Sequence, residues 1–153
     1  MSVRRAQLVR NGQTVDVSDI DEAYRLFWNS LLVMPWEAEA SPEPRLTVLL
    51  LADSLIQNGG LLNWLTDEAA PGESAALSAV CREFGLSELA DLVDEGQHRV
   101  SGASDDELDE LEDELDPRYA TLSESIDPAV RRWWERHVWR RRAADRQPRT
   151  PSP

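Results

Sequence analysis

The chain has no lysine, one cysteine and two histidines among its 153 residues. The single cysteine, Cys81, excludes an internal disulfide and fits a reducing compartment. The histidines, His98 and His137, lack the His-x-x-x-His or Cys-x-x-Cys spacing expected of a metal site. The longest apolar run, residues 48–52, is too short to cross a bilayer, and no apolar leader follows the first arginines. We therefore expect a cytoplasmic protein.

Motifs of common catalytic and cofactor sites are also missing. The chain contains no Gly-rich phosphate loop, no Gly-x-Ser-x-Gly elbow and no calcium loop. Cys81 stands beside Val80 in a helical pattern, which favours a small buried residue over a nucleophile. The many acids of the chain lie close together in one run, so nothing predicts the separated pKa values of an acid–base pair. We expect no enzymatic activity, no cofactor and no metal.

Charge is abundant and unevenly placed. The formal net charge is −13. The segment from Arg131 onward contains eight arginines and two acids, a net charge of +6. Residues 1–130 contain eight arginines and 27 acids, a net charge of −19. An acidic body repels nucleic acid and anionic membranes and attracts basic proteins, although solubility alone is the simplest interpretation of such a charge. We expect a basic protein partner, no direct nucleic-acid binding and no membrane contact.

Glycine, proline and capping residues divide most of the chain into helices. The segment 45–57 is apolar on nearly all sides, which predicts the central, most buried helix. Alternating polar and apolar residues around Asn11-Gly12 favour a small N-terminal β-hairpin. The predicted class is all-α, with six to seven short helices around one central apolar helix. The predicted helices span about 21–34, 45–57, 61–66, 74–84, 87–99, 104–116 and 127–146.

The same glycine, proline and capping residues predict the domain organisation. Residues 1–18 form an arm or hairpin, and residues 19–146 form an acidic helical domain with a basic last helix. Residues 147–153 contain three prolines, which is typical of a disordered tail.

The most informative segment is the acidic run 105–116, in which nine of twelve residues are carboxylates. The other three, Leu108, Leu111 and Leu115, recur at i, i+3 and i+7 and predict a narrow apolar seam on one side of a helix. Ser104 and Glu107 form a predicted capping box at its start, and Pro117 is expected to end it. The candidate partner-binding residues are Asp105, Asp106, Glu107, Asp109, Glu110, Glu112, Asp113, Glu114 and Asp116.

The basic end of the chain allows several interpretations. Trp133 and Trp134 fall on the packing face of the last helix, whereas Trp139 covers a neighbouring helix or contacts a partner, including a second copy in a homodimer. The arginines from Arg140 onward are a solvated helix end, an intramolecular clasp on the acidic run, or a nucleic-acid site. The acidic body argues against the nucleic-acid site, and tethering favours the clasp.

Two motifs resemble those of a known family. Residues 53–65, DSLIQNGGLLNWL, look like its helix ending in Asn-Gly-Gly followed by an apolar-aromatic helix. The step Leu115, Asp116, Tyr119 then resembles its "Leu-Asp-x-x-Tyr" entry into a final helix, which continues with Leu122 and Ile126. The family is the one named for DNA mimic protein nineteen, and the resemblance covers about residues 46–137. It implies an all-α cytosolic bacterial protein whose acidic surface imitates DNA phosphates.

The leading hypothesis is therefore a non-catalytic acidic module that binds a basic protein. The resemblance implies a DNA-binding regulator of the helix-turn-helix type, which the acidic surface would keep from its operator. The alternative is a structural or regulatory subunit whose acidic helix is neutralised by its own C-terminal arginines.

Overall fold

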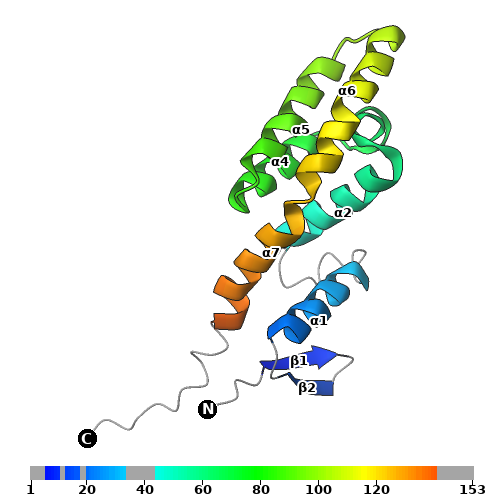
Figure 1. Ribbon diagram of the computed structural model, residues 1–153. Coiled ribbons are helices and arrows are strands. Elements are labelled where there is room, and N and C mark those ends of the chain that lie inside the picture. Colours follow the sequence, from blue (N-terminus) through cyan, green and yellow to red (C-terminus); the bar gives the residue numbers. More distant parts are fainter. Residues whose placement is uncertain (1–5, 11–12, 18–19, 34–43, 141–153) are drawn as a thin grey trace, which may run out of the picture. The chain divides into compact units, whose positions relative to one another are not determined.

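The computed structural model describes residues 6–10, 13–17, 20–33 and 44–140 (Figure 1). It separates the chain into two compact units, one of residues 1–33 with 131–153 and one of residues 34–130. Helices make up most of the described residues, which confirms the predicted all-α class. The domain boundaries at 18 and 146 stay predictions, and the tail 147–153 lies outside the described residues.

The first unit begins with two short strands. β1 (Ala6–Arg10) and β2 (Gln13–Val17) pair antiparallel, with Ala6 opposite Val17 and Arg10 opposite Gln13. The Asn11-Gly12 turn predicted between them lies outside the described residues. Helix α1 (Ile20–Val33) follows.

Aromatic side chains form the interior of the first unit. Helix α7 (Ile126–Trp134), within which the two units divide, continues into a π-helical turn, η2 (Glu135–Trp139). Trp134 is 1% exposed, and its ring centroid lies 5.4 Å from Tyr24 and 5.8 Å from Phe27 of α1. Trp134 is thus buried as predicted, whereas Trp133 is half-buried and stacks on the exposed His137.

Arg131 joins the two helices of this unit at their surface. Its guanidinium pairs with Asp21 of α1 and with Glu135, at 3.1 Å, and lies 5.2 Å from the centre of the Tyr24 ring. These contacts raise the pKa of Arg131, first through the hydrogen bond to Asp21. Arg131 therefore serves the fold of its own unit.

The second unit is a bundle of helices. Its elements are α2 (Pro44–Gly59), α3 (Leu61–Asn63), the π-helical turn η1 (Trp64–Glu68), α4 (Glu73–Glu83), α5 (Ser87–Val100) and α6 (Asp105–Ser123). Helix α5 packs between α4 and α6 and also touches α3 and η1, while α2 packs on α3, α4 and η1 (Figure 1). The fully buried side chains include Leu49, Trp64, Leu77, Leu92 and Leu115.

The prediction that Pro117 ends the acidic helix is wrong. Helix α6 continues through Pro117 to Ser123. Proline removes one backbone donor, that for the Asp113 carbonyl four residues earlier. Both residues are exposed, so water can satisfy that carbonyl, while the next turn is held by Tyr119, which is 3% exposed.

The helices α6 and α5 begin differently. The capping box at the start of α6 is confirmed: Glu107 N–H donates to Ser104 Oγ at 3.4 Å, and Ser104 N–H donates to Glu107 Oε2 at 2.7 Å. Helix α5 begins at Ser87, and Leu86 precedes it without a side-chain cap.

Candidate protein-binding surface

Helix α6 is anchored by the predicted leucine seam. Leu111 is 5% exposed and Leu115 is fully buried, while Leu108, near the helix start, is half-buried. The seam fixes the rotation of α6 against the rest of the second unit. The nine carboxylates are therefore held at defined positions around the remaining circumference.

Asp116 serves the fold. Its Oδ1 accepts a hydrogen bond at 3.1 Å from the N–H of Leu62, in the first turn of α3. Gly60 precedes α3 with φ +89°, and a Cβ there would collide with the carboxylate of Asp116. The Asp116 side chain thus caps α3 in the space that Gly60 leaves open.

A second contact ties the same segments together. The hydroxyl of Tyr119 donates to Asp53 Oδ1 at 2.7 Å. Burial, and then the Asp53 charge, raise the pKa of Tyr119, so the phenol stays protonated and keeps donating. The two motifs that resemble the DNA-mimic family, 53–65 and 115–119, therefore touch each other at two points. Their role in this structure is to join α2 and α3 to α6.

Glu107 also has an internal role. It closes the capping box with Ser104, and the backbone hydrogen bond from Ser104 lowers the pKa of its carboxyl group. A negative charge in the first helical turn also interacts favourably with the helix dipole.

Glu114 belongs to a ring of four charges between α5 and α6. Arg99 of α5 donates to both Glu114 oxygens, at 2.8 and 2.7 Å, and to Glu95 at 3.0 Å. Arg118 of α6 donates to both Glu95 oxygens, at 3.2 and 2.9 Å, and lies 3.6 Å from Glu114. The arginines lower the pKa of Glu114, chiefly through Arg99, and of Glu95, chiefly through Arg118.

The other six of the nine predicted partner-binding acids have no such internal role. They are exposed, and they form no hydrogen bond or ion pair with any residue that the structure describes: Asp105, Asp106, Asp109, Glu110, Glu112 and Asp113. Four of them recur at i, i+3, i+4 and i+7. Three of these four precede the three seam leucines by two residues each. Because two residues correspond to about half a turn of an α-helix, the four lie on the side opposite the seam. We call these four the outer ridge: Asp106, Asp109, Glu110 and Asp113.

The outer ridge holds charge at regular spacing. At about 1.5 Å of rise per residue, Asp106, Asp109 and Asp113 follow one another at steps of roughly 4.5 and 6 Å along the axis. Duplex DNA presents one phosphate about every 3.4 Å along each strand. The ridge is thus a row of fixed negative charges of similar though coarser spacing, and long basic side chains can span the difference.

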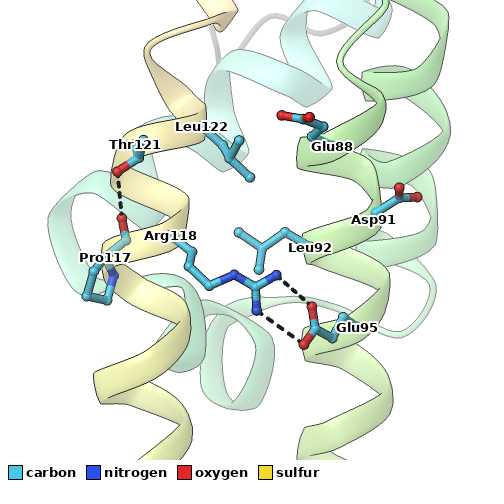
Figure 2. A pocket seen from close by; sticks show the side chains of 8 residues that line it. All are labelled: Glu88, Asp91, Leu92, Glu95, Pro117, Arg118, Thr121 and Leu122. Atoms are coloured by element: carbon cyan, nitrogen blue, oxygen red, sulfur yellow. Dashed lines mark hydrogen bonds and ion pairs between the residues drawn. The ribbon is translucent and has the colours of Figure 1, made fainter.

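An open groove lies beside the ridge, between α5 and α6 (Figure 2). Its volume is about 610 Å³. Leu92 and Leu122 point into its middle, and Arg118 reaches across it to Glu95. The lining residues are Glu88, Asp91, Leu92, Glu95, Pro117, Arg118, Thr121 and Leu122.

The groups considered for catalysis lie in different environments. Cys81 is fully buried, and burial raises the pKa of its thiol to about 12. His98 is exposed and lines a separate hollow of about 480 Å³ near the start of α6. Among the described residues, no group of three metal-ligating side chains could hold an ion. Within the same part of the chain, no helix has the length and apolar character needed to span a membrane.

Comparison of the chain with family models, with curated proteins and with solved structures finds no match. The resemblance to the DNA-mimic family therefore stays a prediction. So does the clasp by the C-terminal arginines, because Arg141, Arg142 and Arg146 lie outside the described residues.

Proposed function

We propose that the outer ridge of α6 binds the arginine and lysine side chains of a basic protein. In the form suggested by the resemblance, the partner is a bacterial DNA-binding regulator of the helix-turn-helix type, met in the cytoplasm and held away from its operator. The observation that carries this proposal is the set of four ridge carboxylates, which are exposed and without a partner among the described residues, on a helix anchored by Leu111 and Leu115.

Anchoring matters because binding then orders little of the protein itself. Charges on a flexible tail lose conformational entropy on binding, whereas charges on a packed helix are already in place. The excess negative charge also speeds the encounter with a basic partner, an effect that weakens as salt rises. The proposed complex should therefore form rapidly at low salt and compete with duplex DNA.

A capture experiment tests the proposal. Immobilised protein is exposed to bacterial lysate at low and high salt, and captured DNA-binding proteins are challenged with duplex DNA. We expect DNA to displace them. The ridge variant Asp109→Asn/Asp113→Asn should lose most of this capture, because it removes two of the four ridge charges.

The matched control removes the same charge elsewhere. Asp67 and Glu124 are exposed, and neither pairs with any described residue. The variant Asp67→Asn/Glu124→Gln should capture the same proteins as the wild type. Equal capture by the ridge variant and the control variant, or capture that DNA does not affect, contradicts the proposed function.

A further inference from the structure

The groove between α5 and α6 already holds one guanidinium group. Arg118 lies in it with both terminal nitrogens on the Glu95 carboxylate, at 3.2 and 2.9 Å (Figure 2). This fork-to-carboxylate geometry is the one that arginine uses most effectively between proteins. The groove therefore has the shape and charge to receive arginine side chains.

On the α5 rim, Glu88 has capacity for an additional cation. Glu88 is exposed and forms no hydrogen bond or ion pair with a described residue. Asp91 is exposed and bound by Arg82 at 2.8 Å through one oxygen only. Glu88 and Glu95 lie on the side of α5 that faces α6, where Arg118 is the single cation among the lining residues, whereas Asp91 points away from α6 (Figure 2).

The floor of the groove is apolar. Leu92 and Leu122 point toward each other in the middle of the groove, below Glu88 and above Arg118 in the view of Figure 2. Leu92 is only 1% exposed, so the accessible apolar surface comes from the half-buried Leu122 and the exposed Pro117. An incoming segment can thus place an apolar side chain on this floor while its cations reach the α5 rim.

The groove also continues the outer ridge. Pro117 follows Asp113 by four residues, which is one turn further on the same side of α6. From Glu88 to Glu95 the groove extends for about 10 Å along α5, or two helical turns. A ligand lying across ridge and groove therefore meets fixed negative charge first and an apolar floor next.

Resting on the proposed function, we infer that this groove docks a basic amphipathic helix of the partner. The helix would set an apolar side chain on Leu122 and Pro117, over the buried Leu92, and an arginine on Glu88. Arg118 is an internal competitor, because its guanidinium binds both oxygens of Glu95, of which Arg99 binds only one. Charge complementarity between the α5 rim and the helix, together with the apolar floor, defines the occupant.

Two synthetic peptides of 18 residues test the inference by fluorescence anisotropy with the full-length protein. The first is a helix with leucines along one face and arginines beside them. The second has the same composition in scrambled order, so that charge is equal and the apolar face is lost. We expect the wild type to bind the first peptide about tenfold more tightly, and to retain part of that preference at high salt.

Three variants locate the binding site. Thr121→Arg places a cation at the groove rim and should weaken the first peptide about tenfold while changing the second less than about twofold. Ala79→Arg adds the same charge on the exposed side of α4 and serves as the matched control. Arg118→Gln removes the groove's own cation and leaves Glu95 bound by Arg99 through one oxygen only, so it should tighten the first peptide several-fold.

The outcomes separate this inference from the proposed function. Equal binding of the two peptides overturns the inference that the groove is a docking site. Equal weakening by Thr121→Arg and Ala79→Arg also overturns it, and so does weaker peptide binding by Arg118→Gln. Loss of self-association on Thr121→Arg in sedimentation experiments would assign the groove to a second copy instead and also overturns it. Peptide binding that is unchanged in Asp109→Asn/Asp113→Asn contradicts the ridge while leaving the groove standing.

Discussion

Helix α6 carries carboxylates on two sides, and the two sides differ in what they contact. On the inner edges, Asp116 binds the backbone of α3, Glu114 binds Arg99, and Glu107 caps its own helix. The outer ridge forms no hydrogen bond or ion pair with a described residue. The same residue types, within twelve consecutive positions, thus hold the fold together on one side and remain available on the other.

This difference limits the number of acidic residues that can bind a partner. The number of acids in a segment does not indicate how many can receive a partner, because internal donors use some of them. The contacts of α6 leave six of the nine predicted residues exposed and without a described partner, and four of these form the outer ridge. Variants that affect one side and spare the other test the distinction.

Gly60→Ala should have the largest effect on stability. The residue has φ +89° and ψ 155°, a region that only glycine adopts readily, and a Cβ would collide with the Asp116 carboxylate. We expect the free energy of unfolding to fall by about 2–4 kcal/mol, measured by chemical denaturation.

Gly72→Ala is the control for this substitution. Gly72 also has a positive φ, +83°, but a Cβ there would meet nothing within 4 Å. It should lower the free energy of unfolding by only about 1–2 kcal/mol. Equal losses for the two variants would show that the contact between Gly60 and Asp116 contributes nothing.

Asp116→Ala should come next. It leaves the N–H of Leu62 without its acceptor and removes the cap of α3, which lowers the free energy of unfolding by about 1 kcal/mol. Asp113→Ala, three residues earlier on the outer ridge, should change it by less than about 0.5 kcal/mol. A reversed order in urea denaturation would mean that the two sides of α6 have been assigned incorrectly.

A smaller effect is expected from pH. Hydrogen bonds from arginine or backbone lower the pKa of Glu95, Glu107 and Glu114 below the ordinary value of 4.5. The unfolded chain therefore takes up protons first as pH falls. The stabilisation is fully present above pH 4.5 and is lost as the pH falls through the lowered values.

This predicts a melting temperature that decreases from about pH 5 toward pH 3. Glu114→Gln should flatten that decrease, because the variant lacks one of the three shifted carboxyl groups. Glu110→Gln, from the outer ridge, should keep the slope of the wild type. Parallel curves for Glu114→Gln and the wild type would contradict the role of the charge ring.

Much of the fold followed from local sequence. Leucines at i, i+3 and i+7 predicted which side of α6 is buried, because that side depends only on helical periodicity. Ser104 and Glu107 predicted the capping box, because both partners lie within one turn. The same local reasoning failed at Pro117, where packing of the following turn outweighs the loss of one hydrogen bond.

The division of the acids into two groups could not be predicted in this way. The partner of Asp116 is Leu62, 54 residues earlier, and the partner of Glu114 is Arg99 on another helix. Periodicity places both acids on the surface of α6, but only the packing of α3 and α5 supplies their donors. The joint occurrence of the two resembling motifs, 53–65 and 115–119, was the one signal of this contact.

Asp109→Asn should have the smallest effect, and its sign is informative. Asp109 lies among like charges, with Asp105 four residues before it and Asp113 four residues after it. Such pairs destabilise a helix by about 0.2–0.5 kcal/mol each, so the variant should unfold at a slightly higher temperature in low salt, and the gain should disappear in high salt. A lower melting temperature would reveal a stabilising contact and would remove Asp109 from the outer ridge. If the gain is found, the ridge costs the protein stability, and its charge needs an explanation outside the fold, such as the binding proposed above.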